Sequence, residues 1–96
     1  MDEKKLTRIF TVLSVEKRVR MINILKHRTL CVNALAIELG ITPAAVSQHL
    51  RVLRDADIVI DEKHGYFVHY RVNHETLARW RELAENFLCY KEKELQ

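Results

Sequence analysis

A helix–turn–helix pattern over residues 35–53 constrains the fold of this chain more than any other feature. Its first helix is short and has one apolar face, formed by Leu35, Ala36 and Leu39. Gly40 follows, where a helix can end in the left-handed backbone region that glycine enters at low cost. The Thr42 hydroxyl can cap a second helix, and Pro43 fits its first position, where a backbone N–H is not needed. The pattern predicts two helices joined by a tight turn.

The second helix combines an apolar stripe with a face suited to DNA. A spacing of i, i+4 and i+7 predicts that three residues point inward: Val46, Leu50 and Leu53. The other faces carry small residues, hydrogen-bonding side chains and arginines: Ala44, Ala45, Ser47, Gln48, His49, Arg51 and Arg54. Such a helix can lie in the major groove and contact base edges. The alternative is an ordinary helix corner whose outer face is solvated.

Beyond this unit the sequence predicts a β-hairpin. Residues 58–60 and 67–72 have the composition of short strands, and the second segment alternates between two faces. Lys63, His64 and Gly65 supply the turn, with Gly65 suited to a positive φ. A two-stranded hairpin is unstable alone, so it has to pack on the helices as a wing. Lys63 and His64 at its tip are candidates for contact with a flanking minor groove, although a solvated turn would have the same sequence.

These motifs resemble those of the ArsR/SmtB winged-helix repressors. The similarity lies within residues 15–72, in the segments VNALA (32–36), GITP (40–43), VSQHLRVL (46–53), DIV (57–59) and GYFVHYRV (65–72). It implies a mainly α fold with a small β-hairpin, the winged helix-turn-helix in the order α-α-α-α-β-β-α. It also implies binding of double-stranded DNA. The predicted DNA contacts are Thr42, Ala44, Ser47, Gln48, His49, Arg51, Arg54, Lys63 and His64.

A further helix is expected between the N-terminal segment and the helix–turn–helix. Ser14 can cap it, and acidic Glu16 is favourable in its first turn. Its predicted buried stripe is Val15, Val19, Ile22 and Leu25.

Helices at the two ends of the chain, at about residues 2–13 and 75–94, are predicted to form a dimer interface. Asn73 can cap the second of them. Each helix carries an apolar stripe: Leu6, Ile9, Phe10 and Leu13 in the first, and Leu77, Trp80, Ala84 and Phe87 in the second. These stripes exceed what the core of so small a chain requires, so we expect them to hold a homodimer. The alternative is core packing within one chain.

The composition favours one small cytoplasmic domain covering residues 1–96. No apolar run approaches the roughly 20 residues that span a bilayer, so no membrane contact is expected. The net charge of +3 is the sum of +4 in the first 41 residues, zero in residues 42–72 and −1 in residues 73–96. The placement of cations therefore matters more than their number. The sequence has no glycine-rich phosphate loop, nucleophile elbow or zinc-protease histidine pair, and we predict that the protein is not an enzyme.

Two cysteines, Cys31 and Cys89, are candidates for a sensor. In metal-sensing relatives of the resembled family, a Cys-Val-Cys triplet opens the third helix, but here Asn33 replaces the second cysteine. One thiolate is a poor site for soft ions that take two to four sulfurs, and no metal site is assigned. Our hypothesis is that the two cysteines act together, within or between subunits, through a disulfide, a polysulfide or a shared thiophilic metal ion. The alternative is two unrelated reduced thiols.

We interpret the sequence as a homodimeric transcriptional repressor that binds a pseudo-palindromic operator and is released by a signal, for which thiol chemistry and a soft metal ion are the candidates. The alternative function is a winged-helix module that contacts another protein and does not bind specific DNA.

Overall fold

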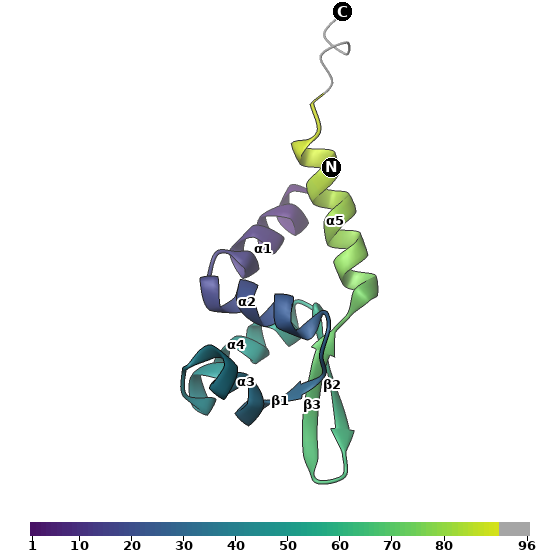
Figure 1. The fold of residues 1–96 in the computed structure, drawn as a ribbon. Helices are drawn as coiled ribbons and strands as arrows, with labels where there is room; N and C mark the ends of the chain where they lie inside the picture. Colours follow the sequence, from purple (N-terminus) through teal and green to yellow (C-terminus); the bar gives the residue numbers. More distant parts are fainter. Residues whose placement is uncertain (91–96) are drawn as a thin grey trace, which may run out of the picture.

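The computed structural model describes residues 1–90, which form five helices and a three-stranded antiparallel sheet. The elements are α1 (Glu3–Leu13), α2 (Glu16–Leu25), β1 (Leu30–Cys31), α3 (Val32–Leu39), α4 (Pro43–Asp55), β2 (Val59–His64), β3 (Phe67–Val72) and α5 (His74–Leu88). The predicted winged helix-turn-helix is confirmed, with β1 as an additional strand. In Figure 1, α2, α3, α4 and the sheet form the lower body, and α1 and α5 extend from its upper end.

The helix–turn–helix forms for the local reasons that the sequence indicated. Gly40 ends α3 in the left-handed conformation, with a φ of 65°. The hydroxyl oxygen of Thr42 accepts a hydrogen bond from the backbone N–H of Ala45 at 3.1 Å and so caps α4. The predicted inward stripe of α4 is buried: Val46, Leu50 and Leu53. These residues belong to one apolar core shared by α2, α3, α4 and one face of the sheet.

The sheet has the strand order β1-β3-β2. β1 pairs with β3 through Leu30 and Tyr70 and through Cys31 and His69. A strand of only two residues has no recognisable sequence pattern, so this pairing was not predicted. β2 is longer than the predicted segment 58–60 and pairs with β3 as far as His64.

The turn of the hairpin is shifted from its predicted place. It comprises Gly65 and Tyr66, because His64 already pairs with Phe67, and Gly65 has a φ of 64°. The prediction that Lys63 and His64 form the turn is therefore wrong. Both lie at the end of β2, and Tyr66 is the fully exposed residue at the tip.

Two details of the second helix also differ from the prediction. Ser14 ends α1 and donates its hydroxyl to the Thr11 carbonyl at 2.6 Å, so Val15 precedes α2 as its N-cap and provides no side-chain hydrogen bond. Val19 is 45% exposed, and Met21 takes its place in the core with no exposed surface. The helix is therefore rotated relative to the predicted stripe, because its buried face has to meet both α4 and the sheet.

The last helix is shorter than predicted. Asn73 caps α5 as expected, accepting from the backbone N–H of Thr76 at 3.4 Å. The helix ends at Leu88, and Cys89 has extended backbone angles, so the predicted helix to residue 94 is wrong at Cys89 and Tyr90. Residues 91–94 lie outside the described part of the chain.

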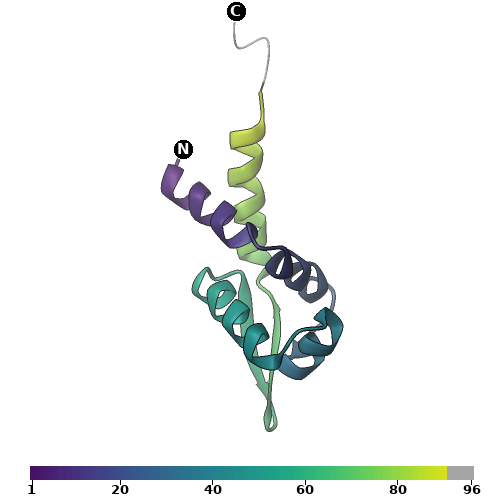
Figure 2. The ribbon, with the colours of Figure 1, turned by 90° about the vertical axis from the view of Figure 1, so that its left-hand side faces the viewer.

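α1 packs against both α2 and α5. Figure 2 shows α1 crossing α5 near the body, with the distal half of α5 extending beyond it. Among the described residues, no helix is long and apolar enough to cross a membrane.

Candidate nucleic-acid interface

The exposed face of α4 carries most of the predicted DNA contacts. Six of these side chains are exposed in or immediately before the helix: Thr42, Ala44, Ser47, Gln48, Arg51 and Arg54. The helical repeat of 100° per residue places Gln48 and Arg51 opposite the buried stripe. This face therefore presents an amide group and a guanidinium group, both of which can form hydrogen bonds in a groove of DNA.

The helix–turn–helix and the hairpin lie at the same end of the molecule, away from the distal part of α5 (Figure 1). Lys63 and His64 are exposed at the far end of β2, next to the turn. A flat or grooved partner could thus meet α4 and the wing together, which is the arrangement that a DNA duplex requires.

Arg54 is held by the root of the wing. Its Nη1 lies 3.3 Å from Oδ2 of Asp61 in β2, and both side chains are about half exposed. The Arg54 charge is therefore partly neutralised. Arg51 takes part in no ion pair among the described residues, so its charge is not neutralised as that of Arg54 is.

His49 does not share the exposed face. Its side chain is half-buried at the edge of the core. Burial, and secondarily the positive charge of Arg18, lower the pKa of His49 below its usual value. Arg18 is itself fixed, since its Nε donates to the carbonyl of Val12 at 2.7 Å. The structure therefore places His49 toward α2 and away from the other predicted contacts.

A charge network orders the outer face of the wing. Glu62 accepts from Nε of Arg71 at 2.5 Å, and its second carboxylate oxygen lies 3.2 Å from Nε2 of His64. These hydrogen bonds, that to Arg71 first, lower the pKa of the Glu62 carboxyl group. The ring of His64 also packs on that of His69, with centroids 4.6 Å apart. His64 is thus part of this network, and Lys63 is the freer of the two predicted wing contacts.

The predicted dimer residues fall into two groups. Leu6 and Ile9 are 5% and 3% exposed, because α2 and α5 of the same chain already cover that side of α1. Both add little exposed surface, although Ile9 lines the apolar groove described next, so the expectation is corrected for Leu6. Phe10 and Phe87 are 41% and 49% exposed and pack together with ring centroids 6.2 Å apart.

An apolar groove of about 540 Å³ runs between α1, α2 and α5. Six of the eight predicted interface residues line it: Ile9, Phe10, Leu13, Leu77, Trp80 and Ala84. α5 buries only Thr76 among its fifteen residues. The apolar stripe of α5 is therefore only partly covered within one chain: Leu77, Trp80 and Ala84 are partly buried, and Phe87 is exposed.

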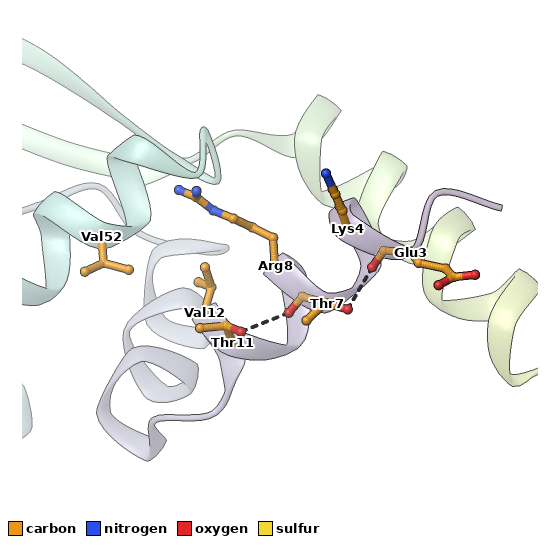
Figure 3. A pocket seen from close by; sticks show the side chains of 7 residues that line it. All are labelled: Glu3, Lys4, Thr7, Arg8, Thr11, Val12 and Val52. Carbon is orange, nitrogen blue, oxygen red and sulfur yellow. Dashed lines mark hydrogen bonds between the residues drawn. The ribbon is translucent and has the colours of Figure 1, made fainter.

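The opposite side of α1 is polar. A second hollow, of about 580 Å³, separates this side from Val52 of α4 (Figure 3). The hydroxyls of Thr7 and Thr11 donate to the carbonyls of Glu3 and Thr7, at 2.7 and 3.0 Å. α1 therefore has one apolar side, toward α5, and one hydrophilic side, toward α4.

The structure does not bring the two cysteines together within one chain. Cys31 is half-buried in β1 and Cys89 is exposed just after α5, and both are free thiols. The fifteen residues of α5 span about 22 Å between the sheet and Cys89. The expectation of a bridge within one subunit is therefore corrected. Within residues 1–90, no group of three or more His, Cys, Asp or Glu side chains is placed to hold a metal ion.

Sequence comparison identifies the family of this fold. The family model "Bacterial regulatory protein, arsR family" matches residues 16–61. The arsenical resistance operon repressor of Escherichia coli (strain K12) is 32% identical over 88 residues, covering 88% of this chain and 74% of that protein. The chain belongs to the arsR family. The cadmium resistance regulator CadC of Listeria innocua serovar 6a is 30% identical over 87 residues, with 90% and 73% covered.

Solved structures agree with the arsR assignment. A possible transcriptional regulator for arsenical resistance superposes with a TM-score of 0.77 at 34% identity, covering 90% of each chain. HlyU from Vibrio cholerae N16961 has a TM-score of 0.72 at 27% identity, covering 94% of this chain and all of that one. The family predicted from the sequence is confirmed. This arsR protein is a DNA-binding transcriptional repressor and not an enzyme.

The inward position of His49 predicts how the free energy of unfolding depends on pH. Because its pKa is lowered in the folded chain, the unfolded chain binds a proton near pH 6.5 that the folded chain does not. Stability is then complete above about pH 6.5 and falls below it. We expect His49→Gln to lose less free energy of unfolding than the wild type between about pH 7.5 and about pH 5.5, measured by urea denaturation. Equal losses in the two proteins would contradict this placement.

Proposed function

We propose that two copies of this chain form a dimer that represses transcription by occupying a pseudo-palindromic operator. The observation that carries the proposal is the separation of two surfaces, with the exposed face of α4 at one end and the only partly covered apolar stripe of α5 at the other. A two-fold dimer joined through α5 and α1 would present two copies of α4 to one duplex. The half-site centres should then lie about 10 base pairs, or a multiple of this, apart.

Within each half-site, Ser47 and Gln48 are assigned to base edges. A Gln side chain can donate to and accept from adenine with its two amide atoms. Arg51 and Lys63 are assigned to phosphates, since neither takes part in an ion pair among the described residues. Thr42 and Ala44 flank the start of α4, where recognition helices approach the bases most closely.

Substitutions at neighbouring positions of α4 should separate these two roles. Gln48→Ala should weaken binding to the preferred duplex by about 1–3 kcal/mol and relax the base preference at one position of each half-site. Arg51→Ala should weaken binding to preferred and random duplexes alike and should reduce the salt dependence. Fluorescence anisotropy over a series of salt concentrations measures both effects. If Gln48→Ala weakened specific and random DNA equally, the assignment of Gln48 to a base would be wrong.

A second copy of the chain is the proposed occupant of the apolar groove between α1, α2 and α5. Phe10 and Phe87 expose aromatic surface along one side of the molecule, and Trp80, which is partly buried against the core, lines the same groove as Phe10. A solution structure of the homodimeric winged domain of Mb0332 from Mycobacterium bovis superposes with a TM-score of 0.72 at 23% identity. This likeness concerns the fold, and the dimer of the present chain rests on its own exposed surface.

Phe10→Glu should break this dimer. It places a carboxylate in the apolar groove, where burial would strongly penalise the charge. We expect a shift toward monomer in sedimentation at micromolar concentration, with loss of specific DNA binding. Thr7→Glu is the matched control because it adds the same charge to the polar side of α1. A wild-type protein that sediments as a monomer under these conditions, or a dimeric Phe10→Glu variant, would contradict the proposal.

The proposed signal acts on the thiols of Cys31 and Cys89, between subunits. Cys31 directly precedes α3, so its modification would disturb the helix–turn–helix at its start. Relatives named for arsenical and cadmium resistance support a thiophilic signal. Cys31 alone does not fit such an ion, which takes two to four sulfurs. A disulfide between the two cysteines would instead require an oxidant that accepts two electrons while both thiols lose their protons.

The double variant Cys31→Ser/Cys89→Ser should bind DNA as the wild type does. It should also stay bound in the presence of diamide, a sulfide donor, arsenite or cadmium, whereas the wild type is released by at least one of them. Binding is measured by the same anisotropy assay. Release of wild type and double variant at equal reagent concentrations would rule out a thiol sensor.

A further inference from the structure

Three side chains join the segment that follows α4 to the start of α5. The hydroxyl of Thr76 donates to Oδ2 of Asp57 at 3.3 Å and accepts from Nη2 of Arg79 at 3.1 Å. The same nitrogen of Arg79 lies 3.8 Å from Oδ2 of Asp57, which closes the triangle. We call these residues, Asp57, Thr76 and Arg79, the junction clamp.

Asp57 has an unusual backbone at this junction. It is the only non-glycine residue with a positive φ among the described residues, at 62°. Its N–H donates to the carbonyl of Arg54 at 2.9 Å, and the next N–H, of Ile58, donates to Leu53 at 3.1 Å. These bonds end α4 and turn the chain into β2. Since an L-residue rarely adopts this conformation, the side-chain bonds of Asp57 help to hold it.

Thr76 is the anchor of α5 in the body. It is 3% exposed, the only buried polar residue in the described chain, and the only residue of α5 that is buried. A backbone bond of 2.9 Å from Asn73 to Ile58 lies beside it and ties the end of β3 to the residue before β2. The direction in which α5 leaves the body is therefore set jointly by this first turn and by α1, which packs against α5 further along.

This attachment matters because α4 and α5 carry different proposed functions. α4 reads DNA and α5 pairs with the partner subunit, so the angle between them determines how far apart the two reading helices stand. One base pair changes the position of a half-site by about 3.4 Å and its direction by about 35°. A small change in the angle therefore alters which spacing the dimer fits.

We propose that the junction clamp sets the half-site spacing that the dimer accepts. The proposal rests on the proposed function, a DNA-binding dimer joined through α5. Asp57, Thr76 and Arg79 are positioning residues that need no contact with DNA.

Thr76→Val tests the clamp with little disturbance of the fold. Valine has nearly the shape of threonine but lacks the hydroxyl. The partner side chains, Asp57 and Arg79, are 71% and 59% exposed and can be solvated by water instead. Thr76→Ser, which keeps the hydroxyl, is the matched control. Urea denaturation of each variant establishes that it is folded.

The probe is a duplex selected from a random library with the wild-type protein. Its spacer is then lengthened and shortened in single base-pair steps, and the dissociation constant is measured for every spacer at one salt concentration. The quantity compared is the ratio of dissociation constants between a shifted and the best spacer. We expect Thr76→Val to lower this ratio by about fivefold. Thr76→Ser should keep the wild-type ratio, and both variants should keep the base preference within a half-site.

A merely structural role for Thr76 would weaken binding to all spacers alike. An unchanged ratio in folded Thr76→Val would therefore overturn the clamp while leaving the DNA-binding dimer intact. If the wild type binds no selected duplex as a dimer, the proposed function fails, and the clamp fails with it. Equal broadening in Thr76→Ser would also overturn the proposal, because the hydroxyl would then be irrelevant.

Discussion

The burial of the apolar stripe of α4 is the interaction on which the rest of the structure depends. Val46, Leu50 and Leu53 are almost completely removed from solvent against α2, α3 and the sheet. Once they are buried, the rotation of α4 about its axis is settled, and with it the side chains that face outward. Gln48 and Arg51 are exposed for this reason, and His49 is not. The reading face is thus a consequence of the core.

The second constraint is that α5 is only partly covered by the core, against which Leu77 and Trp80 pack. α5 is buried at Thr76 and exposes most of its remaining surface, including Phe87. A chain of 96 residues can bury only part of its apolar surface alone. In the proposed dimer, a second copy would bury part of the remainder. In the proposed dimer, subunit pairing and DNA binding are thereby linked through one junction, at which Asp57 keeps a rare backbone conformation.

The sequence predicted those features that depend on neighbours in the chain. Gly40, Thr42 and Asn73 act where local capping rules place them, and the period of α4 identified its buried face. Features that depend on residues far apart in the sequence were not predicted. β1 exists only because Leu30 and Cys31 meet β3, and the hairpin turn follows the pairing of His64 with Phe67. Likewise, the ion pair of Arg54 and the burial of Leu6 required the packing of separate elements.

In the proposed repressor, two copies of α4 contact one duplex. A hydroxyl-radical footprint of the wild-type protein on a selected duplex tests it most directly, together with the mass of the complex. We expect two protected regions related by two-fold symmetry, centred about 10 base pairs or a multiple apart, with two chains bound. One protected region with a single chain bound, or uniform weak protection along the duplex, would contradict the claim.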